Sequence, residues 1–237
     1  MVRKGEAEAN EISYETSPFP QLLSWFPPPK VVFDVGANIG LYSRLYAYHF
    51  PKAKVYSFEP VKSTFKTLVA NGLPNMTCCN VALSSECGEA RMTNKPNDTG
   101  NRICEDGSET VTTVTGRQFC SDHDIDRVNF LKVDAEGHDL DVLRGFDLKK
   151  VDALQVEAGA NRHDHTLIPY RDIEEFMWNE GFYLFRHYNQ TFEFKKGVGT
   201  AIVPHDKRIN ILFKALPILR RMDPVFINGC FLPQEIA

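Results

Sequence analysis

The chain contains the run Val31-Val-Phe-Asp-Val-Gly-Ala-Asn-Ile-Gly-Leu-Tyr-Ser43, which has the pattern of a buried strand, a turn of small residues and a helix. The next apolar segment ends at Phe58-Glu59-Pro60, so a carboxylate stands at its tip. Glycines allow a backbone to approach a ligand closely, and an acid at the end of the neighbouring strand can accept hydrogen bonds from both ribose hydroxyls. Together the two motifs predict a nucleoside site.

Apolar strands alternate with helical segments from Lys30 onward. The predicted strands are Val31–Val35, Lys54–Phe58, Met76–Val81, Asn129–Val133 and Ala153–Glu157, and the predicted helices are Leu41–His49, Lys62–Asn71, Leu140–Leu143 and Tyr170–Asn179. Three further β-like segments follow at Phe182–Arg186, Phe192–Phe194 and Thr200–Val203. This order predicts an α/β fold with a mostly parallel sheet, helices on both faces and an antiparallel end.

The same alternation divides the chain into three parts. Residues 1–29 are expected to form a leader that packs on the core, residues 30–205 the main domain, and residues 206–237 a C-terminal extension. The polar segment Gly88–Val114 is expected to be a hairpin-bearing insertion. In the extension, Arg208–Arg221 has the pattern of a basic amphipathic helix, which we expect to pack on the domain or at a homodimer contact rather than on a membrane.

Composition limits the partners and the compartment. The chain has 237 residues, enough for one substantial core, and its net charge of −4 gives no electrostatic reason to expect a nucleic acid. No apolar run approaches the roughly 18 residues that span a bilayer, and residues 5–11 are polar and acidic, unlike a secretion signal. Six cysteines without a C-x-x-C pair predict reduced thiols, several of them in the core, in a cytoplasmic protein.

The glycine turn Asp34-Val-Gly36-Ala-Asn38-Ile-Gly40 differs from the dinucleotide fingerprint G-x-G-x-x-G. That fingerprint brings a pyrophosphate onto the N-terminus of a helix, where the side chain of Asn38 would crowd it. The Asn38 amide can instead hydrogen-bond a polar group such as an amino-acid carboxylate. The other interpretation is an ordinary tight turn between a strand and a helix.

A third motif is Phe130-Leu-Lys-Val-Asp-Ala-Glu-Gly-His-Asp-Leu-Asp-Val-Leu-Arg-Gly145. Its apolar strand delivers Asp134 and Glu136 to the carboxyl edge of the sheet, where ligands bind in open α/β folds. Gly137 allows a close approach there. Alternatively, either acid satisfies backbone amides at the start of the following helix.

These blocks, with Asn80-Val-Ala-Leu83 before Gly88, resemble the FkbM family of S-adenosylmethionine-dependent methyltransferases. The resemblance covers roughly Val31 to Val203, and the Lys-Val-Asp-Ala-Glu-Gly core is its most specific part. It implies a Rossmann-like class I methyltransferase fold, with a seven-stranded sheet and an antiparallel final strand. Members are typically O-methyltransferases of hydroxyls on sugars, glycolipids or polyketide-type natural products.

The resemblance also implies roles for individual residues of the cofactor site. The turn that begins at Asp34 would line the methionine end of S-adenosylmethionine through Gly36, Asn38 and Gly40. Glu59 would hold the ribose, Val81 and Ala82 would lie against the adenine, and Asp134 would sit near the sulfonium. The chain departs from the family pattern after Glu157, where Ala158 and Gly159 stand in place of a frequent histidine, and at Val114-Thr-Gly116 in place of Thr-Leu-Asp.

Methyl transfer to a hydroxyl of a small-molecule or glycan acceptor requires positioning and a general base. His163 and His165 follow the fifth strand and are candidates for the base, and His138 is another. Asp134, Glu136 and Glu157 would orient the acceptor hydroxyl or jointly bind a divalent cation such as Mg²⁺. The chain lacks a diagnostic metal spacing, so the sequence does not favour a metal. The Gly88–Thr110 insertion is expected to help shape the acceptor pocket.

Two other functions fit parts of the pattern. A nicotinamide-dependent reductase or epimerase would need a pyrophosphate loop and commonly a helical Tyr-x-x-x-Lys, but the only match, Tyr48 to Lys52, runs through Pro51. A scaffold that has lost its cofactor is the non-enzymatic alternative. The presence of Glu59 and the glycine turn argues against it.

Overall fold

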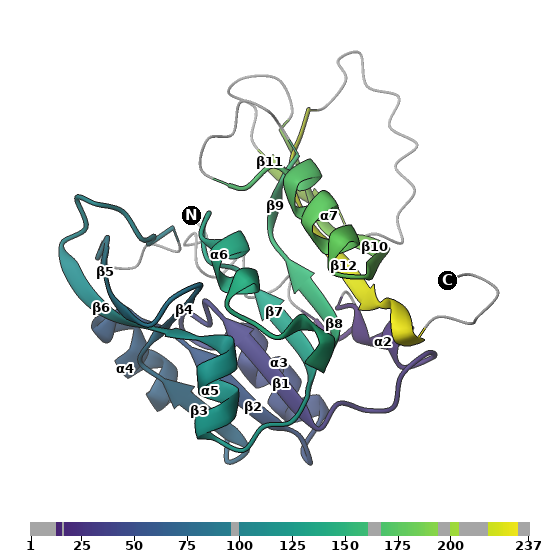
Figure 1. Cartoon of the computed structure of the whole chain (residues 1–237), viewed down its shortest axis with the longest axis horizontal. Coiled ribbons are helices and arrows are strands. Elements are labelled where there is room, and N and C mark those ends of the chain that lie inside the picture. The colour runs from purple at the N-terminus through teal and green to yellow at the C-terminus, as the bar shows by residue number, and fades with distance from the viewer. Residues whose placement is uncertain are drawn as a thin grey trace, which may run out of the picture.

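The computed structural model describes residues 13–15, 17–95, 100–160, 167–193, 200–203 and 218–231. Within them, a nine-stranded sheet has the order β11-β10-β12-β8-β7-β1-β2-β3, with β9 paired to β12 (Figure 1). Its strands are β1 Val31–Val35, β2 Lys54–Phe58, β3 Met76–Cys79, β7 Val128–Val133, β8 Val151–Val156, β9 Ala158–Gly159, β10 Phe182–Glu193, β11 Thr200–Val203 and β12 Ile218–Asn228.

The direction of the strands confirms a mostly parallel sheet with an antiparallel end, but the described sheet has nine strands rather than the seven that the family resemblance implied. Strands β3, β2, β1, β7 and β8 pair in parallel, whereas β12 is antiparallel to both β8 and β10. From β1 the chain builds the sheet outward through β2 and β3, then returns to the other side of β1 with β7 and β8. The order therefore reverses between β1 and β7, and a crevice forms beyond the carboxyl ends of such strands.

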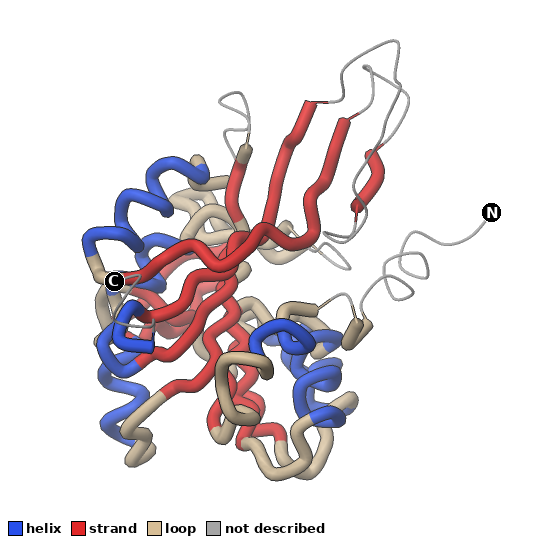
Figure 2. The backbone as a smooth tube through the Cα atoms, turned by 90° about the vertical axis from the view of Figure 1, so that its right-hand side faces the viewer, coloured by secondary structure: helices blue, strands red, loops and turns tan. Residues whose placement is uncertain are grey.

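Helices cover both faces of the sheet (Figure 2). They are α2 Phe19–Leu22, α3 Leu41–His49, α4 Lys62–Ala70, α5 Gly116–Asp122, α6 Asp139–Arg144 and α7 Tyr170–Asn179, with short 3₁₀ turns at Leu148–Lys150 and Gly229–Phe231. Neighbouring strand residues point to opposite faces. Phe33 thus packs in one core cluster with α5, α6 and α7, while Val32 packs in another with α2 and α3. Burial on both faces explains the uninterrupted apolar runs of the strands.

The described residues of the segment that precedes β1 include side chains that pack on the core. Phe19 and Leu22 are each only 3% exposed and belong to the cluster on the α3 face. The Phe19 ring lies 5.3 Å from Tyr46, 4.7 Å from Phe50 and 4.7 Å from Phe130, measured between ring centroids. Helix α2 therefore covers part of this face of the sheet.

The predicted insertion is a second, three-stranded sheet in the order β4-β6-β5. Its strands are β4 Ala82–Ser84, β5 Gly88–Met92 and β6 Glu109–Thr115, and β5 pairs antiparallel with β6 as a hairpin would. The third predicted strand is too long, because β3 ends at Cys79 and Ala82 already belongs to this second sheet. Helix α5 was not predicted. The Thr115 hydroxyl caps its start, accepting a hydrogen bond from the Gln118 amide at 3.0 Å.

The C-terminal helix prediction is wrong where it can be compared. Ile218–Arg221 begins strand β12, and Val225, Phe226 and Ile227 pair with Gln155, Leu154 and Ala153 of β8. Residues 208–217 lie outside the described part. A helix through Arg208–Arg221 would have contained Pro217, which lacks the amide hydrogen that a helix interior needs. The main sheet thus continues beyond the boundary expected at residue 205.

All six cysteines are free thiols. The expectation that several are core residues is not met, because Cys79 and Cys120 pack against the core yet are only partly buried, and Cys87 and Cys230 are exposed. Among the described residues, no helix combines the length and the apolarity that a membrane crossing requires.

We predict that Phe19→Ala lowers the free energy of unfolding by about 3 kcal/mol, because it empties a buried aromatic site. Urea denaturation measures the loss. Trp25→Ala is the matched control in the same leader: Trp25 is 52% exposed, so its loss should cost less than about 1 kcal/mol. Equal effects of the two substitutions would contradict the packing role of the leader.

Candidate cofactor and acceptor site

The candidate site is built on the residues that immediately follow four parallel strands. Each donates its backbone N–H to the carbonyl of the last residue of the adjacent strand, so the four are locked side by side along the carboxyl edge. The pairs are Glu59 to Cys79 at 3.0 Å, Gly36 to Phe58 at 3.1 Å, Asp134 to Val35 at 3.1 Å and Glu157 to Val133 at 3.1 Å.

The glycine turn is shaped by contacts within the protein. Gly36 has a φ of +76°, and a Cβ there would overlap the backbone carbonyl oxygen of Asp134. Asn38 is also left-handed, with a φ of +49°. A side chain at position 36 would therefore separate the turn after β1 from the end of β7. This close approach, rather than room for a ligand, is the strongest requirement for glycine in the turn.

Glu59 joins this turn to the end of β2. Its Oε2 accepts a hydrogen bond from the backbone N–H of Asn38 at 3.1 Å, and its Oε1 accepts one from the backbone N–H of Val61 at 2.8 Å. The residue is 6% exposed. Burial raises the pKa of Glu59 to about 7, although both amides favour the charged form. Each carboxylate oxygen has a second lone pair, so Glu59 can still accept hydrogen bonds from ligand hydroxyls.

A cleft opens beside Glu59. One wall is apolar and is formed by the second sheet and residues next to it, namely Val81, Ala82, Leu83, Met92 and Ile103. Gly36, Asn38 and Asp134 line it as well. An apolar wall with a carboxylate at one end suits a flat base attached to a sugar.

A buried lysine links the glycine turn to the acids. The Lys132 side chain is 3% exposed, and its Nζ lies 2.8 Å from Asp134 Oδ2, 3.7 Å from Asp34 Oδ1 and 4.5 Å from the centre of the Tyr42 ring. Asp34 is fully buried, and its Oδ2 accepts a hydrogen bond from the Ser43 hydroxyl at 2.6 Å. Lys132 therefore supplies positive charge to two carboxylates, that of Asp134 on the lining of the cleft and that of Asp34 beneath it.

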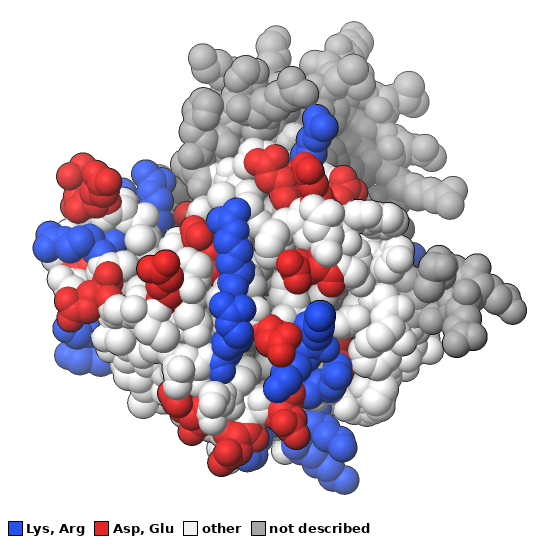
Figure 3. Space-filling view, in the orientation of Figure 1, with Lys and Arg blue, Asp and Glu red and all other residues white. Residues whose placement is uncertain are grey.

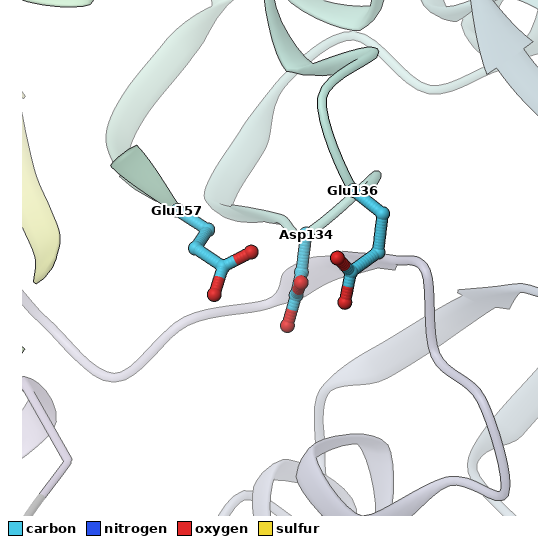
Figure 4. A group of neighbouring side chains, drawn as sticks. All are labelled: Asp134, Glu136 and Glu157. Carbon is cyan, nitrogen blue, oxygen red and sulfur yellow. The ribbon is translucent and has the colours of Figure 1, made fainter. Parts of the chain in front are cut away.

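Three acids meet where the cleft reaches β7 and β8. Asp134, Glu136 and Glu157 each offer an oxygen within 4.8 Å of the others, and Figure 4 shows Asp134 between the two glutamates. Arg221 of β12 donates a hydrogen bond to Glu157 Oε1 at 2.9 Å. Burial raises the pKa of Glu157 well above its usual value, and the negative charge of Asp134 raises it further.

Asp139 shapes the loop that carries these acids. Its carboxylate accepts hydrogen bonds from the backbone amides of Ala135 and Gly137, both at 3.0 Å. Glu136, between them, has a left-handed φ of +50°. Burial raises the pKa of Asp139 to about 6. The first turn of α6 thus fixes the loop in the conformation that brings Glu136 toward Asp134.

The structure places most of the predicted site residues around one cleft. Gly36, Asn38, Glu59, Val81, Ala82, Asp134 and Glu136 line it, and Glu157 joins through the acid cluster. Asp34 and Gly40 are not among its lining residues: Asp34 lies beneath the turn, and Gly40 approaches the Leu68 side chain. His163 and His165 lie outside the described residues.

His138 also lines the cleft, but its ring is already engaged. Its Nε2 lies 2.9 Å from the Ser84 hydroxyl and its Nδ1 lies 3.5 Å from Asp141. Burial lowers the pKa of His138. A neutral imidazole held in this way positions α6 against β4.

Sequence reasoning missed three residues that organise the site: Lys132, Asp139 and Arg221. A signal existed for Lys132, since a charged residue in the middle of an apolar strand must find a partner. Asp139 had a weaker one, because it begins the helix after the Asp134–Gly137 loop. Arg221 had none, because its contact with Glu157 depends on the pairing of β12 with β9.

The chain belongs to the family described as the methyltransferase FkbM domain, whose model matches residues 34–184. A hexuronic acid methyltransferase, AglP of Haloferax volcanii, is 34% identical over 146 residues, covering 57% of this chain and 59% of that protein. The 31-O-demethyl-FK506 methyltransferase FkbM of Streptomyces tacrolimicus is 40% identical over 75 residues, or 30% of this chain and 29% of that one. The matches with both proteins thus span less than two thirds of their lengths.

Solved structures confirm the fold. The M. capricolum protein TrmK, determined with S-adenosyl-homocysteine, superposes with a TM-score of 0.50 over 92% of this chain and 69% of that one, at 9% identity. At this identity the similarity concerns the fold alone. The fold is therefore the Rossmann-like class I methyltransferase fold that the sequence predicted.

We predict that S-adenosylhomocysteine binds about tenfold more weakly at pH 6 than at pH 8 in calorimetry. The ribose hydroxyls would donate to the ionised Glu59 carboxylate, whose pKa is about 7 in the free protein. Affinity should therefore fall as pH drops through that value. Glu59→Gln should bind weakly and without this pH dependence. Equal affinity of the native protein at both pH values would contradict the role of Glu59.

Proposed function

We propose that the chain transfers the methyl group of S-adenosylmethionine to a hydroxyl oxygen of a sugar or sugar-like acceptor. The observation that carries this proposal is the placement of Glu59 and the Asp134–Glu136–Glu157 cluster at one cleft. The first suits a ribose, and the second suits a polyhydroxylated acceptor. Membership of the FkbM methyltransferase domain family supports the reaction class.

The residues present fit the cofactor. The apolar wall of Val81, Ala82 and Met92 would cover the adenine, Glu59 would accept the ribose hydroxyls, and Asn38 would face the amino-acid end. The adenine would then lie toward the second sheet and the sulfur toward Asp134. The Gly88–Thr110 insertion contributes to this cofactor wall through Met92, Asn101 and Ile103, so in this proposal it shapes the cofactor half of the cleft.

When bound, the cofactor supplies an electrophilic methyl group on a positively charged sulfur. The protein has to hold an acceptor oxygen in line with that methyl and remove one proton. Asp134 and Glu136 line the cleft and can accept hydrogen bonds from acceptor hydroxyls. Lys132 fixes Asp134 from below, and Arg221 fixes Glu157. We propose that His163, which follows β9 in the sequence, is the general base that removes the proton of the acceptor hydroxyl.

The acceptor class rests on chemistry and on similarity together. Several carboxylate oxygens at one end of a cleft match the many hydroxyl donors of a sugar. The Haloferax volcanii relative is described as a hexuronic acid methyltransferase, which makes a sugar or glycan the first acceptor to test. Nucleic acid is not part of the proposal. Figure 3 shows acidic and basic side chains interspersed over the described part of one face, rather than a continuous basic surface.

The proposal extends to the setting of the protein. Six free thiols suit a reducing compartment such as the cytoplasm. A homodimer was expected only as a contact for a helix over Arg208–Arg221, and Ile218–Arg221 instead begins β12, so a homodimer is not part of the proposal.

A thermal-shift comparison of S-adenosylhomocysteine with NAD tests the cofactor. We expect S-adenosylhomocysteine to raise the melting temperature and NAD to leave it unchanged, since the Asn38 turn leaves little room for a pyrophosphate. Asn38→Arg should abolish the shift by filling the cleft. A shift with NAD would favour the reductase alternative, and a response to neither compound would favour a scaffold without a cofactor.

We predict that Glu136→Ala and His163→Ala lower kcat by about 100-fold or more while the affinity for S-adenosylhomocysteine stays within about threefold. Glu136 lines the cleft, and His163 is the residue to which we assign proton removal. Transfer of labelled methyl to a panel of sugar acceptors gives kcat, and calorimetry gives the affinity. Unchanged kcat in both variants would refute the assignment of these residues to the reaction.

A further inference from the structure

We infer that Asp134, Glu136 and Glu157 hold a divalent cation of the Mg²⁺ or Mn²⁺ type, which binds the acceptor hydroxyl. This inference rests on the proposed function and adds to it a metal that the sequence did not favour. The three residues are separated by 2 and 21 positions in the chain, so they do not form a compact sequence motif for a metal site. The parallel sheet brings them together.

The donor set and its dimensions fit such an ion. All three ligands are carboxylates, and their oxygens lie within 4.8 Å of one another. Opposite oxygens around Mg²⁺ lie about 4.2 Å apart, because each is about 2.1 Å from the ion. Adjacent oxygens lie only about 3.0 Å apart, so side-chain rotations would have to bring some of the carboxylate oxygens closer to one another by up to about 2 Å. Hard oxygen ligands select hard cations such as Mg²⁺ and Mn²⁺.

One carboxylate oxygen in the cluster is buried and has no bond. Glu157 is 8% exposed; its Oε1 is held by Arg221, while its Oε2 has no hydrogen-bond partner among the described residues. A buried acceptor without a partner is costly. Figure 4 shows the side chain of Glu157 directed toward Asp134. A cation between the acids would supply the missing partner.

Carboxylates gather closely in and around the cluster. Asp134 gives one oxygen to Lys132, and Glu157 gives one to Arg221. Glu136 adds a third carboxylate to the cluster itself. Two further acids act on the same groups: Asp34 lies by Lys132, and the negative charge of Asp223 acts on Glu157. A divalent ion between the acids would offset the repulsion between neighbouring carboxylates.

Such an ion would activate the acceptor without entering the methyl transfer itself. An acceptor hydroxyl bound to the cation becomes more acidic, so its proton passes more readily to a basic group of the protein. The oxygen then forms a bond to the methyl carbon as the carbon–sulfur bond breaks, and the sulfur keeps the electron pair. With two vicinal hydroxyls on one ion, the cation would also orient a sugar acceptor.

Titration of the full chain with MnCl₂, followed by the electron paramagnetic resonance signal of free Mn²⁺, tests the site. We expect one strong Mn²⁺ site per chain, with an affinity at least tenfold lower in Glu157→Gln and in Glu136→Gln. Glu86→Gln removes an exposed acid away from the cleft and should change the affinity less than twofold. Calorimetry with S-adenosylhomocysteine on the same samples shows that each variant is folded.

The two measurements separate the inference from the proposed function. Native protein that binds S-adenosylhomocysteine but not Mn²⁺ would overturn the metal site and leave the function standing. Mn²⁺ affinity in Glu157→Gln and Glu136→Gln equal to that of the native protein would also overturn the metal site. Failure to bind S-adenosylhomocysteine would instead count against the proposed function. Glu157→Gln removes the charge that pairs with Arg221 and so could destabilise the protein. Glu136 is only partly buried, so Glu136→Gln should remain folded and still test the site.

Discussion

The site depends on one row of four backbone hydrogen bonds that crosses the carboxyl edge of the sheet. Through it, Glu59, Gly36, Asp134 and Glu157 stand next to one another as the first residues after β2, β1, β7 and β8. The row tolerates little change, because a Cβ at Gly36 would overlap the Asp134 carbonyl. Since the residues of the cofactor turn and of the acid cluster share this row, neither part of the site can move independently of the other.

The edge would be electrostatically unfavourable without its two partner cations. Lys132 is fully enclosed between Asp34 and Asp134, and Arg221 reaches Glu157 from the antiparallel strand. Removing one member of the buried Lys132–Asp34 pair typically costs about 3–5 kcal/mol, because the other charge is left uncompensated. The Arg221 side chain is 43% exposed, so its pair with Glu157 is screened by solvent and contributes less. The C-terminal strand therefore does more than complete the sheet. It carries the charge that holds one of the three acids in place.

Strands buried on both faces could be predicted well from the sequence. The predicted bounds of β1, β2 and α3 match the structure, since continuous apolar runs bounded by turns leave few alternatives. The positions of Glu59 and Asp134 followed from the ends of such strands. Strand β12 could not be found in this way, because its partner β8 lies far away in the sequence and its Arg and Ile residues also fit a helix. The contact of Arg221 with Glu157 was hidden for the same reason, and so was the partnerless oxygen of Glu157.

A crystal structure of the chain with bound S-adenosylhomocysteine would show directly whether one edge of the sheet holds both the cofactor and the acids. The account predicts ribose hydroxyls within hydrogen-bond distance of Glu59, adenine against Val81 and Ala82, and the sulfur on the side of Asp134. A ligand bound outside this cleft, or one whose adenine lies against Asp134, would contradict it.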